Sequence, residues 1–208
     1  MTDKNVSIMN IGSMGYLPQV FKKIENEKKL NIVYLGGSIT MGCNATKTEL
    51  RYVDRSAKWW QTNFPDAEIS YFNAGIGATT SQFGVARVQE HVLDKQPDLV
   101  FVEFSVNDSS SPLFMETYES LVRRLLKAES VKAVVLINNL FYNTGTNAQG
   151  IHNAVGLHYD LPIVSVRNYI FPEIQLGNVC LADYTADMLH PTDLGHKMIA
   201  DLICNLLD

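Results

Sequence analysis

Residues 31–40 read Asn-Ile-Val-Tyr-Leu-Gly-Gly-Ser-Ile-Thr, a short apolar run that ends in two glycines and a serine. The unbroken series of β-forming residues predicts a strand that is buried on both faces. The two glycines predict a tight turn at its end, which would leave the Ser38 hydroxyl exposed. This one stretch therefore sets the fold class and supplies the first candidate functional residue.

Four further runs have the same character and lie at 69–74, 99–104, 133–137 and 162–166. Continuous apolar runs are typical of parallel strands that helices cover on both sides. Amphipathic stretches fill the gaps, at 17–28, 56–64, 81–95, 115–129 and 191–207. The alternation predicts an α/β protein with a three-layer α/β/α architecture and a mostly parallel five-stranded sheet. We expect a single domain over 1–208, with a helical lead-in over 1–29.

The composition narrows the functional classes. The chain has 208 residues, 46% of them hydrophobic, which is enough for one substantial core. Its net charge is −5 and no basic patch stands out, so we expect no nucleic-acid partner. Three cysteines without metal-like or disulfide-like spacing favour a reduced compartment. No secretory signal or membrane span is visible, and a cytoplasmic location is expected unless the sequence has been trimmed.

Polar segments follow three of the expected strands directly. Ser38 follows the first, the small-residue loop 75–79 follows the second, and Asn107 and Asp108 follow the third. Ligands of open parallel sheets bind beyond the carboxyl ends of the strands. The three segments therefore converge on one edge of the sheet and predict a site there.

A serine is a weak nucleophile unless a base takes its proton and an acid orients that base. Residues 187–191 read Asp-Met-Leu-His-Pro, just before the last expected helix. Asp187 is close enough in sequence to fold back onto His190, although an ordinary loop histidine beside a turn aspartate has the same pattern. His196 is the rival base, but it lies inside the expected helix and is interpreted as a packing or surface residue. The other histidines have no comparable partner.

Ester hydrolysis also needs hydrogen-bond donors for the oxyanion of the tetrahedral intermediate. The candidates are the backbone N–H of Ser38, a backbone N–H of loop 75–79 and the side-chain amide of Asn107. Each also has a plain structural reading, as a turn or a helix cap. Asp108 is interpreted as such a cap rather than as a catalytic acid, and Cys43 as a packing residue.

Four segments in this order resemble the SGNH (GDSL-type) esterases: Gly-Gly-Ser-Ile-Thr at 36–40, Asn-Ala-Gly-Ile-Gly-Ala-Thr-Thr at 73–80, Val-Asn-Asp at 106–108, and Asp-x-x-His-Pro at 187–191. The resemblance implies a flavodoxin-like fold and hydrolysis through an acyl-enzyme, without cofactor or metal. It makes Ser38 the nucleophile, His190 the general base and then acid, and Asp187 the orienting carboxylate. The oxyanion hole would combine the Ser38 amide, an amide of the second segment and the Asn107 side chain.

Two positions depart from the family pattern. Gly37 stands where the family usually has aspartate, and the Gly-Gly-Ser form resembles a branch with carbohydrate-active members. Ala78 stands where the second segment normally has glycine. Its backbone amide can still serve if the loop does not require a positive φ there, and Gly77 is the fallback donor.

The sequence favours a serine esterase that removes short acyl groups, acetyl above all, from a small molecule or carbohydrate. A stacking surface for a sugar could come from four aromatic residues for which core packing is the other reading: Trp59, Trp60, Phe141 and Tyr142. A lipid-directed thioesterase, lysophospholipase or acyltransferase is the alternative within the fold, and a non-catalytic binding module is the alternative outside enzymology. A nucleotide-binding protein is disfavoured because the first turn has neither Gly-x-Gly-x-x-Gly nor a Walker-type lysine.

Overall fold

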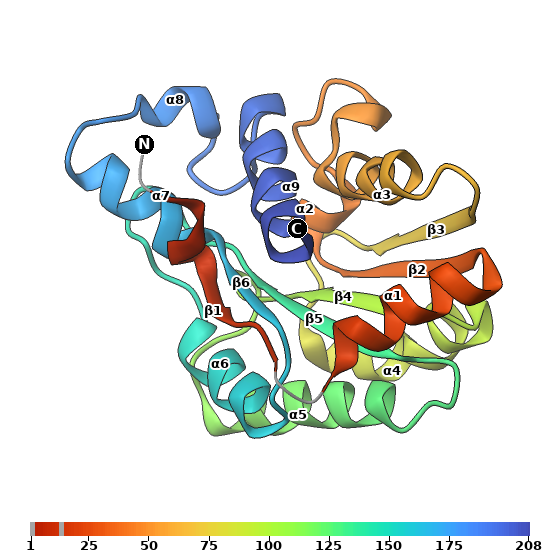
Figure 1. Ribbon diagram of the computed structural model, residues 1–208. Helices are drawn as coiled ribbons and strands as arrows, with labels where there is room; N and C mark the ends of the chain where they lie inside the picture. The colour runs from red at the N-terminus through yellow and green to blue at the C-terminus, as the bar shows by residue number, and fades with distance from the viewer. Residues whose placement is uncertain (1–2, 13–14) are drawn as a thin grey trace.

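The computed structural model describes residues 3–12 and 15–208. Within these residues, a mixed six-stranded sheet lies between two layers of helices (Figure 1). The strands follow one another across the sheet in the order β1-β6-β5-β4-β2-β3, and all neighbouring pairs are parallel except β1 with β6. Their bounds are β1 Ile8–Asn10, β2 Lys29–Gly36, β3 Glu68–Gly75, β4 Leu99–Glu103, β5 Ala133–Asn138 and β6 Ile163–Ser165.

The helices divide between the two faces of the sheet. The described helices are α1 Tyr16–Glu27, α2 Ser38–Met41, α3 Tyr52–Asn63, α4 Ser81–His91, α5 Pro112–Leu126, α6 Gln149–His158, α7 Val166–Gln175, α8 Leu181–Tyr184 and α9 Asp193–Leu207, with 3₁₀ turns at Lys4–Ser7, Thr48–Leu50 and Leu93–Lys95. Helices α1, α3, α7 and α9 contribute buried side chains to one core, and α4, α5 and α6 contribute to the other. The three-layer prediction is confirmed.

Strand β4 shows why continuous apolar runs mark this sheet. All five of its residues are buried. Leu99 and Phe101 point into the core beneath α1, α3, α7 and α9, whereas Val100 and Val102 point into the core beneath α4, α5 and α6. Both faces are therefore apolar, and each such side chain contributes about 1.5–3 kcal/mol relative to an exposed one.

The expectation of five strands is wrong, because a sixth strand lies in the lead-in that was predicted to be helical. In β1, Ile8 lies opposite Val164 and Asn10 lies opposite Ile163, antiparallel to β6. Three residues are too few to show a hydrophobic period, and Asn10 has no β preference. Its side chain donates to the backbone oxygen of Leu161 over 2.9 Å, which fixes the strand at the sheet edge. The helical part of the lead-in is confirmed by α1.

The strand order places the carboxyl ends of β2 and β4 where ligands are expected. From β2 the chain passes outward to β3 and then returns to β4 on the opposite side of β2. This reversal is the switch point of a doubly wound sheet, where a crevice opens beyond the strand ends. Ser38 follows β2 and Asn107 follows β4, so both flank the switch point.

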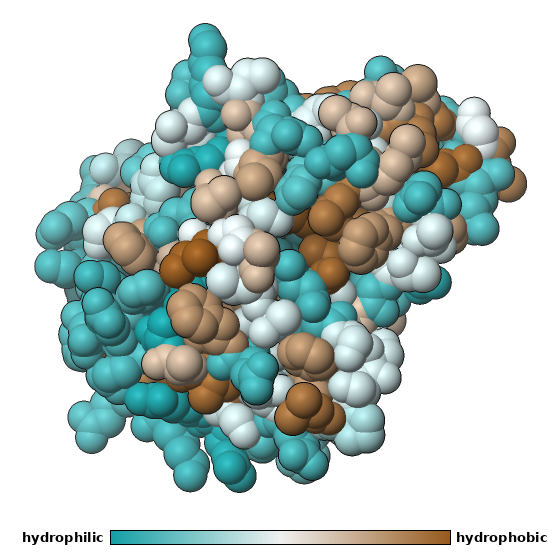
Figure 2. Space-filling model, turned by 180° about the vertical axis from the view of Figure 1, so that it is seen from behind, coloured by the Kyte–Doolittle hydropathy of each residue, from teal (hydrophilic) through white to brown (hydrophobic). Residues whose placement is uncertain are grey.

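Seen from behind, apolar side chains form separate patches among hydrophilic ones (Figure 2). No described helix is both long and apolar enough to cross a bilayer.

Candidate active site

Ser38 is the first residue of the short helix α2 and is only 8% exposed. Gly37 has a φ of −88°, which other residues also adopt, so its backbone conformation does not require glycine. Glycine is needed before Ser38 because neighbouring atoms lie too close for a side chain. A Cβ added to Gly37 would lie 2.5 Å from Oδ1 of Asn107, and one added to Gly36 would lie 2.1 Å from Oγ1 of Thr40. The missing side chains therefore let the nucleophile turn pack directly against the Asn107 amide and α2.

His190 reaches both of its predicted partners. Its Nε2 lies 2.9 Å from Oγ of Ser38, and its Nδ1 lies 2.6 Å from Oδ2 of Asp187. An ionised carboxylate can only accept, so Nδ1 carries the proton and Nε2 is left to accept from the serine hydroxyl. The structure therefore brings together the three residues that the sequence singled out, in the order that proton transfer from serine requires.

The loop that carries Asp187 is held by its own backbone. Oδ1 of Asp187 accepts from the N–H groups of His190, over 2.7 Å, and of Leu189, over 3.1 Å. The Thr185 hydroxyl donates to the His190 backbone oxygen over 2.9 Å. Burial raises the pKa of Asp187, but the hydrogen bonds from the His190 side chain and from these N–H groups outweigh it and lower the pKa to about 2. Asp187 is thus ionised at every pH at which an esterase works.

Two of the expected oxyanion contributors, Asn107 and the fallback Gly77, lie close to the turn that carries Ser38. The Asn107 amide adjoins Gly37, as the glycine geometry shows, and a Cβ on Gly77 would lie 3.9 Å from Cβ of Ser38. Ala78 has a φ of +57°. The loop therefore adopts the left-handed conformation at this alanine, whereas the sequence-based assignment of its amide required a negative φ. An alanine in that region costs about 1 kcal/mol relative to relaxed backbone. The N–H of Ser38 opens a helix, where backbone donors have no partner within the helix.

Asp108 is a helix cap, but it caps α4 and not the element that follows it, since Ser111 caps α5, and it has a further partner that the sequence did not reveal. Its Oδ1 accepts from the N–H of Ser81, the first residue of α4, over 2.9 Å. Its Oδ2 lies 3.0 Å from Nε2 of His152, and both side chains are 0% exposed. Helix α6, which carries His152, was not predicted, and its partner is 44 residues away in sequence. Two Asp–His pairs therefore lie at this end of the sheet.

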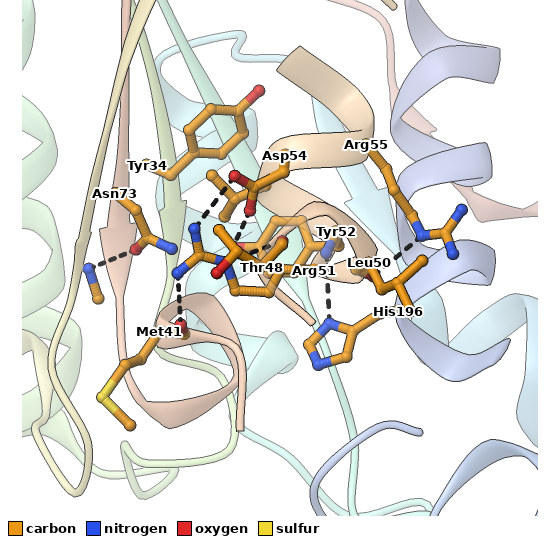
Figure 3. A network of polar contacts seen from close by, with 12 residues as sticks. Tyr34, Met41, Thr48, Leu50, Arg51, Tyr52, Asp54, Arg55, Asn73 and His196 are labelled. Carbon is orange, nitrogen blue, oxygen red and sulfur yellow. Dashed lines mark hydrogen bonds and ion pairs between the residues drawn. The ribbon is translucent and has the colours of Figure 1, made fainter. Parts of the chain in front are cut away.

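His196, the rival base, is buried, and its two ring nitrogens contact backbone groups rather than Ser38. Its Nε2 donates to the backbone oxygen of Cys43 over 3.0 Å. Its Nδ1 accepts from the N–H of Tyr52 over 3.4 Å, a contact that Figure 3 shows. The Tyr52 hydroxyl in turn contacts Oγ1 of Thr40 in α2 over 2.8 Å. His196 is thus a packing residue, as predicted, and it fixes the segment that follows the nucleophile.

Other candidates have structural roles. Burial, and after it the Asp187 carboxylate, raises the pKa of the Cys43 thiol, which is the opposite of activation. Trp60 and Tyr142 are fully buried, and Trp59 and Phe141 pack against the same core, so the core reading holds for these aromatic residues. Among residues 3–12 and 15–208, no three acidic, histidine or cysteine side chains gather as metal ligands would.

Comparisons with known proteins agree with this geometry. Residues 34–198 match the model of the GDSL-like lipase/acylhydrolase family. An acetylxylan esterase of Geobacillus stearothermophilus is 25% identical over 207 residues, which cover 86% of this chain and 93% of that protein. Thioesterase 1/protease 1/lysophospholipase L1 of Escherichia coli (strain K12) is 24% identical over 183 residues, which cover 85% and 82%.

A solved structure is more similar still. A two-domain esterase (CEX) active on acetylated mannans, co-crystallised with mannopentaose, is 45% identical and superposes with a TM-score of 0.98. The match covers 100% of this chain but 56% of that one, so this chain spans little more than half of the two-domain protein. The chain belongs to the GDSL-like lipase/acylhydrolase family and is a carboxylic ester hydrolase.

Proposed function

We propose that this chain removes acetyl groups from a carbohydrate, with acetylated mannan as the first substrate to test, through an acyl-enzyme on Ser38. The observation that carries the proposal is the contact of 2.9 Å between Oγ of Ser38 and Nε2 of His190, with Asp187 behind the imidazole. The sugar is supported by the acetylxylan esterase and, more strongly, by the mannan-active esterase at 45% identity.

In the first step, Oγ of Ser38 attacks the ester carbonyl carbon while Nε2 of His190 takes the hydroxyl proton. The Asp187 carboxylate stabilises the imidazolium that forms and holds its orientation. The carbonyl π electrons move to oxygen, which becomes the oxyanion of a tetrahedral intermediate. The N–H of Ser38, the Asn107 amide and the N–H of Ala78 are the proposed donors to this oxygen, with the N–H of Gly77 as the alternative.

The intermediate then expels the sugar oxygen, and His190 returns the proton to it from Nε2. This leaves an acetyl group on Ser38 and a free sugar hydroxyl. Water attacks the acetyl carbonyl while His190 accepts one of its protons. The second collapse releases acetic acid, which loses its remaining proton to solvent and becomes acetate, and the proton held by His190 restores the Ser38 hydroxyl.

The backbone at Ala78 does not meet the condition stated from the sequence, because its φ is +57°, yet the alanine adopts the conformation that a glycine would have. An alanine held at a φ of +57° persists only where the surrounding structure imposes it. The family has glycine here, which adopts this φ without cost. The conformation is therefore kept although the residue that suits it is absent.

The test compares acetate release from acetylated mannan and acetylated xylan by the wild type, by Ser38→Ala and by Ser109→Ala. Ser109 is exposed and contacts Ser111. The wild type and Ser109→Ala should release acetate, faster from mannan, and Ser38→Ala should be inactive. Full activity in Ser38→Ala would overturn the mechanism.

Acyl length separates carbohydrate from lipid substrates. On p-nitrophenyl esters, the rate should be highest with acetate and should fall by the octanoate. A rise in rate from acetate to octanoate, together with hydrolysis of palmitoyl-CoA or a lysophospholipid, would replace the proposal with the lipid-directed alternative.

A further inference from the structure

The second Asp–His pair, Asp108 with His152, cannot take part in proton transfer to substrate. Both side chains are 0% exposed, so neither solvent nor an ester reaches them. The ring of Tyr118 in α5 stacks on the His152 imidazole, with centroids 3.6 Å apart and planes 6° from parallel. Burial of a carboxylate costs free energy through desolvation, and well-placed hydrogen-bond partners must offset that cost.

Asp108 joins two segments that the proposed mechanism places at the oxyanion. It follows Asn107 directly in sequence. Its Oδ1 accepts from the N–H of Ser81, where α4 begins immediately after the loop that contains Gly77 and Ala78. Thr80, the N-cap residue of α4, makes no side-chain capping hydrogen bond. The Asp108 carboxylate, which follows β4, caps the helix instead. One carboxylate thus links the side-chain donor and the backbone donor.

His152 fixes that carboxylate from the other side. Its Nε2–H donates to Oδ2 of Asp108 over 3.0 Å, and burial lowers the pKa of the ring despite this contact, which keeps His152 neutral. The start of α6 is itself tied to the end of β4, because the N–H of Ala148 donates to the backbone oxygen of Ser105 over 2.7 Å. The helix that carries His152 is therefore held in place by a backbone hydrogen bond to the segment that follows a central strand.

We propose that Asp108 and His152 are positioning residues that hold the Asn107 amide and the loop 75–80 at a fixed distance from Ser38. The inference rests on the proposed oxyanion hole and adds two residues that touch neither substrate nor Ser38. Preorganised donors stabilise an oxyanion only when they need not reorganise during the reaction. The Asp108–His152 pair supplies that rigidity.

The experiment is a double-mutant cycle on p-nitrophenyl acetate with kcat and KM measured separately. Asn107→Ala alone should lower kcat by about 10²–10³-fold. His152→Leu, which removes the donor to Asp108, should lower kcat by at least about tenfold and leave KM within about twofold. His152→Gln keeps an N–H donor and should recover most of the loss.

Coupling distinguishes positioning from general weakening. In the Asn107→Ala background, His152→Leu should lower kcat by less than about threefold, because the donor that it positions is gone. If His152→Leu does not fold, Asp108→Asn takes its place in the cycle, since it keeps an acceptor for the Ser81 N–H and removes the charge.

A matched control separates stability from alignment. Val122 in α5 is fully buried and belongs to the hydrophobic core of the same layer. Val122→Ala should lower the melting temperature and leave kcat unchanged. Equal losses from His152→Leu in both backgrounds, or wild-type kcat in His152→Leu and Asp108→Asn, would overturn the inference. If Asn107→Ala itself leaves kcat unchanged, the fault lies with the proposed oxyanion hole instead.

Discussion

Two Asp–His pairs lie at the same end of one sheet, and they differ in almost everything except their chemistry. Asp187 and His190 are 2.6 Å apart, with side chains that are 47% and 22% exposed. Asp108 and His152 are 3.0 Å apart and 0% exposed. In the first pair the free nitrogen of the histidine meets Ser38. In the second, Nδ1 of His152 has no hydrogen-bond partner among the described residues.

The comparison teaches that an Asp–His pair alone does not indicate catalysis. Proton transfer needs a third group and a path to substrate, and only the pair on the 185–191 loop has both. The pair between α4 and α6 has burial and stacking instead, which suit it to hold backbone segments in place. Function thus follows from where each pair lies, and variants of one pair should leave the role of the other pair intact.

The largest difference should appear in catalysis. Asp187→Asn should lower kcat by about 10³–10⁴-fold, because an amide favours the wrong tautomer of His190 and cannot stabilise the imidazolium. Asp108→Asn should lower it far less, since Asp108 acts through other groups. Steady-state kinetics on p-nitrophenyl acetate measure both. A loss of less than tenfold in Asp187→Asn would remove that residue from the triad.

Stability should show the reverse ranking. His152→Leu removes the hydrogen bond from the neutral imidazole to the buried Asp108 carboxylate and should lower the free energy of unfolding by about 1–3 kcal/mol. His190→Leu affects a partly exposed loop and should lower it by less than about 1 kcal/mol. Urea denaturation at pH 7 gives both values, and equal losses would contradict the division of roles.

The pH dependence of stability sharpens the same contrast. Burial raises the pKa of Glu103, at the end of β4, from 4.5 to about 7, although Asn139 and Ser105 act against it. Since the native state holds this proton and the unfolded state does not, the stability that Glu103 contributes below pH 4.5 is lost as the pH rises through 7. The pKa of His152 is lowered by burial from 6.5, so its contribution to stability increases as the pH rises towards 6.5.

Glu103→Gln should therefore gain stability relative to the wild type between pH 5 and pH 8, by roughly 2–3 kcal/mol. Asp187→Asn should follow the wild-type slope over this range, because Asp187 titrates between its unfolded pKa of 3.8 and its native value of about 2. Urea denaturation midpoints at pH 5 and pH 8 measure the change in stability of each variant and of the wild type. A wild-type slope in Glu103→Gln would show that Glu103 is ionised in the native state.

The smallest effect concerns backbone strain, which occurs in the loops beside both pairs. Ala78 and Met188 have φ values of +57° and +69°. Ala78→Gly should raise the free energy of unfolding by a few tenths to about 1 kcal/mol and leave kcat within about twofold. Ala57→Gly, in the interior of α3, is the control and should instead lower stability by about 1 kcal/mol. A loss of stability in Ala78→Gly would show that the strain is absent.

Short-range patterns predicted most of the fold and of the exposed pair. Strands β2 to β6 each coincide with an apolar run, and Asp187 and His190 are three residues apart. The expectation that every run is covered on both faces is wrong for β3, because it lies at the sheet edge and is mostly exposed or half-buried. Strand β1 was not predicted, because three residues at a sheet edge are too few to show a hydrophobic periodicity. Helix α7 was not predicted, and one reason is that Pro172 interrupts its helical pattern.

Long-range contacts were not predictable in the same way. Asp108 was recognised as a cap, but its pairing with His152 depends on where α6 lies against α4 and α5, which no local spacing records. The requirement for glycine at position 37 likewise comes from Asn107, 70 positions further along the chain, and not from its own φ. The sequence located the site, and tertiary packing determined which residues support it.

The central claim is that Ser38 is a nucleophile activated by His190 and Asp187. Labelling with a fluorophosphonate followed by peptide mapping tests it most directly, because the probe reacts only with an activated hydroxyl. The account predicts one adduct on the peptide that contains Ser38, strongly slowed in Asp187→Asn and absent in Ser38→Ala. An unmodified Ser38, or an adduct that persists in Ser38→Ala, would contradict it.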